Sequence, residues 1–224
     1  NDRLFSTSSK NYGTNALATT AYDDGYTAGG MYYCNGTGGE TRRNVTINNV
    51  IAGDKIVVYM ASSNAATGTL VFKYLGEDNE QVEKASFTNK GTKYEFVAKY
   101  SGSYKVYTDA AAGKPIYNRI VRIPGVAVSG TIDGAQLSGY KVMFKDEANG
   151  ITYDADIKGN TFTATLAAGC NYTAVLSGVA GYGFSNATKN ISTTVDEALT
   201  GKSGVTLSIE EKKVYTYTGK VTGF

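Results

Sequence analysis

A short motif that occurs twice constrains the fold of this chain more than any other feature. Residues 129–134 and 218–223 both follow the pattern Ser/Thr-Gly-x-Ile/Val-x-Gly, and their offset is 218 − 129 = 89 residues. Similarity at a fixed spacing indicates repeated modules, and this spacing suits one small β-sandwich. We therefore expect the second copy to open a further repeat. We also expect the chain to be a piece of a longer modular protein, whose other domains are its partners.

The composition favours strands throughout. The aromatic residues are 18 Tyr and 8 Phe with no Trp, and only 2 of the 224 residues are Pro. Tyr, Thr and Val suit a half-buried pleated surface, whereas the abundant Gly and Asn suit turns. The sequence predicts an all-β protein.

The best domain boundary is the Pro124-Gly125 dipeptide, because Pro cannot continue a sheet ladder and Gly allows a change of direction. We predict two antiparallel β-sandwiches in tandem, residues 1–124 and 125–224. Residues 1–44 show little apolar periodicity and are expected to supply one or two edge strands and long loops. A helix is suspected only at 196–200. The predicted strands are 44–51, 55–61, 69–75, 93–98, 102–108 and 116–123, then 126–132, 140–145, 151–157, 161–166, 171–177, 189–194 and 205–209.

Several functional classes are disfavoured by what the sequence lacks. There is no histidine, so the usual general base and imidazole metal ligand are missing. Cys34 and Cys170 fall in different predicted domains and are expected to be unpaired. No apolar run is long enough to span a bilayer. Residues 1–124 hold 14 Lys/Arg against 11 Asp/Glu, and residues 125–224 hold 8 against 9. This bias is too weak for a nucleic-acid binder but fits a local cationic site for an acidic ligand.

The second domain resembles the immunoglobulin-like, carboxypeptidase-regulatory-like modules of secreted bacterial proteins. The resemblance rests on residues 128–132, 139–142 and 162–166 with Gly169 and Tyr172. It implies a module that spaces or stiffens its parent chain. Some relatives contain a Lys–Asn crosslink, for which Lys141 is the donor candidate, but residues 205–209 offer no Asn or Asp partner.

The first domain resembles the non-catalytic, jelly-roll-like β-sandwich modules of secreted bacterial pectate lyases and other plant-cell-wall enzymes. Residues 53–59, 94–98, 101–107 and 117–120 carry this resemblance. It implies a secreted or cell-surface bacterial protein that binds polysaccharide, pectin in particular, without catalysis. The alternative is a structural or adhesive stalk with no glycan ligand.

An acidic polysaccharide needs cations for its carboxylates and aromatic rings for its sugar faces. Strand alternation predicts that Lys105 and Tyr107 point outward together while Tyr104 and Val106 enter the core. By the same rule, Tyr117 and Arg119 share a face. The alternative for both pairs is a solvated outer sheet face.

Two further candidates lie earlier in the chain. A second-choice ligand site is formed by Arg43, which follows Arg42, and by Tyr33. The alternative for these residues is again a solvated face. Asp23 and Asp24 precede Gly25 and offer carboxylates to a calcium ion, which needs six to eight oxygens. A plain turn is the alternative, and no other cofactor is expected.

Overall fold

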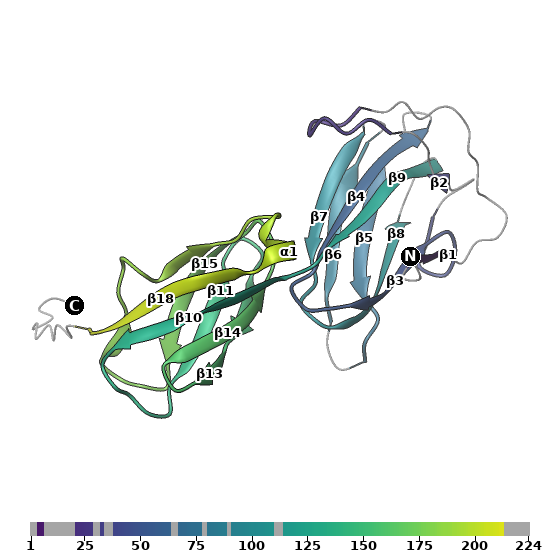
Figure 1. Ribbon diagram of the computed structural model, residues 1–224. Helices are drawn as coiled ribbons and strands as arrows, with labels where there is room; N and C mark the ends of the chain where they lie inside the picture. The colour runs from purple at the N-terminus through teal and green to yellow at the C-terminus, as the bar shows by residue number, and fades with distance from the viewer. Residues whose placement is uncertain are drawn as a thin grey trace, which may run out of the picture. The chain divides into compact units, whose positions relative to one another are not determined.

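The computed structural model shows a protein built almost entirely of strands (Figure 1). The chain divides into two compact units, Asn1–Gly125 and Val126–Phe224. The repeated motif at 218–223 lies outside the described residues. None of the helices in the described ranges is long and apolar enough to cross a membrane. The structure describes residues 4–6, 21–28, 32–33, 38–63, 67–77, 80–88, 91–109 and 114–212.

The first unit consists of two antiparallel sheets. The five-stranded sheet has the order β1-β3-β8-β5-β6, and the four-stranded sheet has the order β2-β9-β4-β7. The strands are β1 (Leu4–Ser6), β2 (Tyr32–Tyr33), β3 (Val45–Val50), β4 (Lys55–Ser63), β5 (Gly68–Tyr74), β6 (Val82–Phe87), β7 (Thr92–Val97), β8 (Gly102–Asp109) and β9 (Lys114–Ile123). As expected, residues 1–44 supply edge strands, because β1 and β2 each end a sheet.

All six predicted strands of the first unit are present, but β6 was missed. Its residues lie at a sheet edge and alternate weakly between half-buried and exposed positions until Phe87. A strand with so little buried surface has little apolar periodicity, which is the signal that sequence analysis depends on.

Alternating residues of both sheets form one core. Tyr104 and Val106 of β8 are fully buried there, as predicted, against Phe72 of β5 and residues of the facing sheet. The rings of Phe72 and Tyr104 stack with their centroids 4.5 Å apart. The buried members of this core are Val45, Ile47, Val50, Ile56, Val58, Met60, Leu70, Phe72, Phe87, Phe96, Ala98, Tyr104, Val106 and Tyr117.

A second apolar cluster lies on the other face of the four-stranded sheet. Tyr22 and Ala28 pack there against Val57 and Tyr59 of β4. Val57 and Tyr59 alternate with the core residues of β4, so they point away from the core. The segment 21–28 therefore covers part of this outer face, and we call it the strap.

The second unit also has two sheets, with strand orders β13-β14-β10-β18-β16 and β12-β11-β15-β17. Pairing is antiparallel except between β10 and β18, which run parallel. The helix α1 (Glu197–Thr200) lies where one was suspected. The strands are β10 (Val126–Gly134), β11 (Lys141–Asp146), β12 (Ile151–Asp154), β13 (Asp156–Lys158), β14 (Thr161–Leu166), β15 (Asn171–Ser177), β16 (Tyr182–Phe184), β17 (Asn190–Ser192) and β18 (Lys202–Glu211).

Two details of the second unit differ from the prediction. The run 151–157, predicted as one strand, is broken at Ala155, because β12 pairs in one sheet and β13 in the other. The short strand β16 was not predicted. The core strands were placed correctly, and their inward side chains include Val128, Phe144, Phe162, Leu166 and Leu207.

Candidate functional site

The strap is shaped by the turn at Asp23, Asp24 and Gly25. Gly25 has a φ of +85°, which glycine adopts without strain. The Asp24 carboxylate accepts a hydrogen bond of 3.1 Å from the Tyr26 N–H, and the Tyr22 N–H donates to the Tyr26 carbonyl at 2.9 Å. This turn brings the rings of Tyr22 and Tyr26 to one side, with their centroids 5.6 Å apart.

Both strap rings pack on Tyr59, which projects from the outer face of β4. The Tyr59 centroid lies 5.0 Å from that of Tyr22 and 4.8 Å from that of Tyr26, both with edge-to-face geometry. Such pairs are favourable beyond the area that they bury. The Tyr22 hydroxyl donates to Asn118 Oδ1 at 2.6 Å, and the Tyr59 hydroxyl donates to Asp24 Oδ2 at 2.7 Å.

The two bonded hydroxyls stay protonated, since burial is the main cause that raises the pKa of both Tyr22 and Tyr59. Their rings are almost fully covered, whereas the Tyr26 ring is partly exposed. Tyr26 is therefore the ring of this cluster that a ligand can reach.

Arg119 completes this surface from β9. Its guanidinium carbon lies 5.1 Å from the centroid of the Tyr26 ring and 5.7 Å from that of Tyr59. A guanidinium at this distance is attracted to the negative face of the ring. Arg119 is exposed and makes no ion pair with any residue that the structure describes. We call Tyr26 and Arg119, with Tyr22 and Tyr59 beneath them, the tyrosine–arginine platform.

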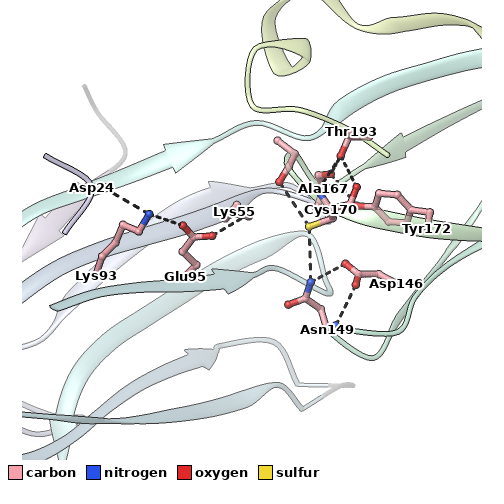
Figure 2. A network of polar contacts seen from close by, with 11 residues as sticks. Asp24, Lys55, Lys93, Glu95, Asp146, Asn149, Ala167, Cys170, Tyr172 and Thr193 are labelled. Atoms are coloured by element: carbon pink, nitrogen blue, oxygen red, sulfur yellow. Dashed lines mark hydrogen bonds and ion pairs between the residues drawn. The ribbon is translucent and has the colours of Figure 1, made fainter. Parts of the chain in front are cut away.

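Charged residues line the neighbouring strands β4 and β7 (Figure 2). Lys93 Nζ lies 3.1 Å from a carboxylate oxygen of Glu95 and 3.6 Å from one of Asp24, and Lys55 Nζ lies 3.1 Å from Glu95. Burial opposes the ionisation of Glu95, but hydrogen bonds from Lys55 and Lys93 outweigh it and hold its pKa below the usual value. The pKa of Asp24 is lowered by the Tyr59 hydroxyl, then by the Tyr26 N–H and Lys93. Asp24 thereby ties the strap to Tyr59 and Lys93.

Tyr117 does not share a face with Arg119, and this prediction was wrong. Arg119 pairs with Tyr59, but Tyr117 pairs with the next residue of β4, Met60, so Asn118 is an extra residue on β9. Such a β-bulge breaks strict alternation. Tyr117 consequently turns into the core, where its side chain is 2 % exposed, and it does not offer a ring to a ligand.

Lys105 and Tyr107 lie on the outer face of the other sheet, so they cannot form one binding face with Arg119. Both point away from the core as predicted, but Glu40 bonds to Lys105 and lies close to the Tyr107 hydroxyl. Lys105 donates to the Glu40 carbonyl at 3.0 Å, and Lys73 pairs with the Glu40 carboxylate at 2.7 Å. Tyr107 is only 8 % exposed. The first-choice residues are thus divided between two surfaces, of which this one is largely covered.

Of the second-choice residues, Tyr33 lies in a strand and Arg43 does not. Arg43 has a φ of +54° and is half-buried, and β3 begins only at Val45, so strand alternation does not apply to Arg42 and Arg43. The backbone of Tyr33 pairs with Ile116 at the edge of the four-stranded sheet. The side chain of Tyr33 lies outside the described residues, as does Cys34.

In the described part of the chain, Asp23 and Asp24 are not joined by a third acidic side chain that could complete a calcium site. Asp23 is exposed in the turn, and the Asp24 carboxylate already accepts from Tyr59 and Tyr26. No group of three or more acidic or cysteine side chains among the described residues could hold a metal ion.

The residues that sequence analysis missed are Tyr22, Tyr26, Tyr59 and Lys93. Two tyrosines that flank an Asp-Asp-Gly turn were a usable signal, because the turn predicts that both rings face the same way. Their position on the outer face of β4 could not be predicted, since it depends on how the strap packs. No model of a known protein family matches the chain, and comparison with curated proteins gives no significant match.

Proposed function

We propose that the first unit binds an acidic polysaccharide of the pectin class, homogalacturonan in particular, without catalysis, through the tyrosine–arginine platform. The parent protein is, in this proposal, a secreted or cell-surface bacterial protein. The observation that carries the proposal is the exposed guanidinium of Arg119, held 5.1 Å from the centroid of a reachable tyrosine ring.

The chemistry of a uronic acid residue suits this pair of side chains. Its carboxylate can accept two parallel hydrogen bonds from a guanidinium, a geometry that lysine cannot offer. The apolar C–H face of the sugar ring can pack on the exposed part of Tyr26. Lys93 adds positive charge nearby, although Glu95 and Asp24 partly neutralise it.

Binding without catalysis is the simpler expectation for this surface. The chain has no histidine. The two carboxylates beside the platform, Asp24 and Glu95, are paired with lysines, and the pKa of each is lowered. A general acid needs a raised pKa to be protonated near neutral pH, so neither carboxylate suits that role.

Affinity electrophoresis in gels that contain homogalacturonan tests the proposal. We expect R119A to weaken retention by about 10- to 100-fold in dissociation constant, the loss typical of a charge-assisted hydrogen bond. R119K should retain only part of the wild-type affinity. Y26A should weaken retention, whereas Y26F should not, because only the ring is required. High salt should weaken binding by the wild type, since exposed charges are screened.

K105A is the matched control, because it removes one cation from the opposite outer face of the same unit. Unchanged retention of K105A together with lost retention of R119A would support the platform. The reverse result would move the site to the face near Glu40. Equal retention of R119A and the wild type would refute the platform.

The second candidate is a stalk that spaces other domains and binds no glycan. It is favoured by the way the end of the first unit is anchored. The Asp54 carboxylate accepts hydrogen bonds from the N–H groups of Ile51 and Gly125 and pairs with Arg122. The chain therefore leaves this unit from a fixed point. Failure of the wild type to bind any acidic glycan would favour the stalk.

A further inference from the structure

The second unit has an open groove of about 510 Å³ on the outer face of its four-stranded sheet. The groove lies over β11, β15 and β17 and the turn that follows β11. It shares no residue with the tyrosine–arginine platform. Its lining residues are Lys145, Glu147, Ala148, Asn171, Tyr172, Thr173, Asn190, Ile191 and Ser192.

Strand register arranges the polar side chains of the groove in two rows. Thr173 of β15 pairs with Lys145 on one side and with Asn190 on the other. Asn171 pairs with Ser192 in the next outward-facing row. Directly paired side chains lie about 5 Å apart, so the amides and hydroxyls form a compact array. Thr173 Oγ1 approaches Asn190 Oδ1 at 3.5 Å, which leaves most of their hydrogen-bonding capacity unused.

Hydrogen bonds join the residues beneath the groove (Figure 2). Tyr172 lies between Asn171 and Thr173 on β15, and its buried side chain points inward, where its hydroxyl donates to the Ala167 carbonyl at 2.8 Å. Thr193 Oγ1 donates to the same carbonyl at 2.6 Å. The buried Asp146 accepts from both the backbone N–H and the side-chain amide of Asn149, which holds the turn beside the groove. A preorganised surface loses less entropy when a ligand binds.

The charge of the groove is balanced. Lys145 and Glu147 are one cation and one anion, both exposed, and neither makes an ion pair with another described residue. A site with no net charge has no electrostatic preference for an acidic or a basic ligand. Each Asn amide instead presents one acceptor oxygen and two donor hydrogens, and each hydroxyl can both donate and accept. Adjacent hydroxyl groups of a sugar ring offer the complementary set.

We propose that this groove binds an uncharged oligosaccharide through Asn171, Asn190, Thr173 and Ser192. The inference goes beyond the proposed function, because it concerns another unit, other residues and a ligand of different charge. Binding is weak, with a dissociation constant on the order of 1 mM, since an open groove without an exposed aromatic ring gains little beyond hydrogen bonds. Its affinity does not depend on salt, unlike that of the platform.

The test is a titration of the complete isotopically labelled chain with xylohexaose, cellohexaose and mannohexaose, followed by amide NMR shifts. Saturable shifts in β15 and β17 with at least one of these neutral probes, unchanged at high salt, are expected. N171A/N190A should abolish them, and the milder S192A should weaken them. Dispersed spectra of both variants establish that they fold.

Two controls separate this result from the platform. K141A changes a residue at the other end of the same sheet face and should bind like the wild type, and R119A should leave the groove shifts intact. Trigalacturonate should shift residues of the platform and not of the groove. The inference would be overturned if no saturable groove shifts appeared at probe concentrations up to about ten times the expected dissociation constant. Shifts confined to other surfaces, or unaffected by N171A/N190A, would overturn it as well.

Discussion

At the scale of single residues, two glycines explain the first copy of the repeated motif. Gly130 and Gly134 of β10 pair with Val205 and Ile209 of the parallel strand β18. A Cβ atom on Gly130 would overlap the Val205 carbonyl oxygen, and one on Gly134 would overlap that of Ile209. The glycines of residues 129–134 therefore allow two backbones to approach closely, and this copy of the motif has a structural role.

Replacement of Gly130 by alanine tests this explanation. We expect G130A to destabilise the second unit by about 1–3 kcal/mol or more, because a backbone carbonyl cannot move aside as a flexible side chain can. S129A changes the neighbouring residue of the same motif and should stay within about 0.5 kcal/mol of the wild type. Urea denaturation of the three proteins measures the difference. Equal stability of G130A and S129A would contradict the close-packing explanation.

At the scale of elements, the strap depends on ionised carboxylates more than on its own secondary structure. The segment 21–28 has a single β-bridge, between Ala21 and Thr27, and is held on β4 by its rings and by Asp24. The pKa values of Asp24 and of its neighbour Glu95 are lowered in the folded protein. A lowered carboxyl pKa stabilises the folded form above the unfolded pKa, and this stabilisation is lost as the pH falls through the folded pKa.

Acid should therefore release the strap before it unfolds the sheets. The packing of the strap on β4 should be equally stable from about pH 5 to 8. It should weaken below about pH 4, where free carboxyl groups become protonated. The protection factors of the Tyr22 and Gly25 amides, which bond within the strap, should fall there, while the amides of β4 keep theirs. D24N should show faster exchange already at neutral pH and less dependence on pH. If the strap amides exchanged equally fast in D24N and in the wild type, the Asp24 carboxylate would not hold the strap.

At the scale of the whole molecule, each unit has buried residues and hydrogen-bonded strands of its own. The Asp54 carboxylate is the clearest single support of the first unit. Its side chain is 2 % exposed, and it pairs with Arg122, which is itself mostly buried. Loss of one partner leaves the other charge buried without compensation.

Two independent unfolding transitions are the expected consequence. D54A should lower the stability of the first unit by about 3–5 kcal/mol and leave the other transition unchanged, and G130A should act only on the second unit. Effects at sites without shared partners should add in the double variant. Scanning calorimetry of the wild type, both single variants and the double variant measures this. If either substitution shifted both transitions, the units would not be independent.

The sequence by itself determined most of the strands and the core face of β8. Alternation along 102–108 correctly placed Tyr104 and Val106 inward, and the Pro124-Gly125 dipeptide lies at the division between the units. These features depend on local periodicity and on backbone chemistry, which act over a few neighbouring residues. The edge strand β6 was lost because its periodicity is weak.

Only the tertiary structure decided which outward residues remain accessible. The extra residue Asn118 turns Tyr117 into the core and leaves Arg119 outside. Glu40 bonds to Lys105, and Tyr107 is almost fully buried. The strap adds Tyr22 and Tyr26 to a surface formed by Tyr59 and Arg119, from parts of the chain far apart in sequence. Periodicity predicts the direction in which a side chain leaves its strand. Periodicity cannot predict a bulge opposite another strand or a segment that packs over the outer face of a sheet, because both arise from long-range packing.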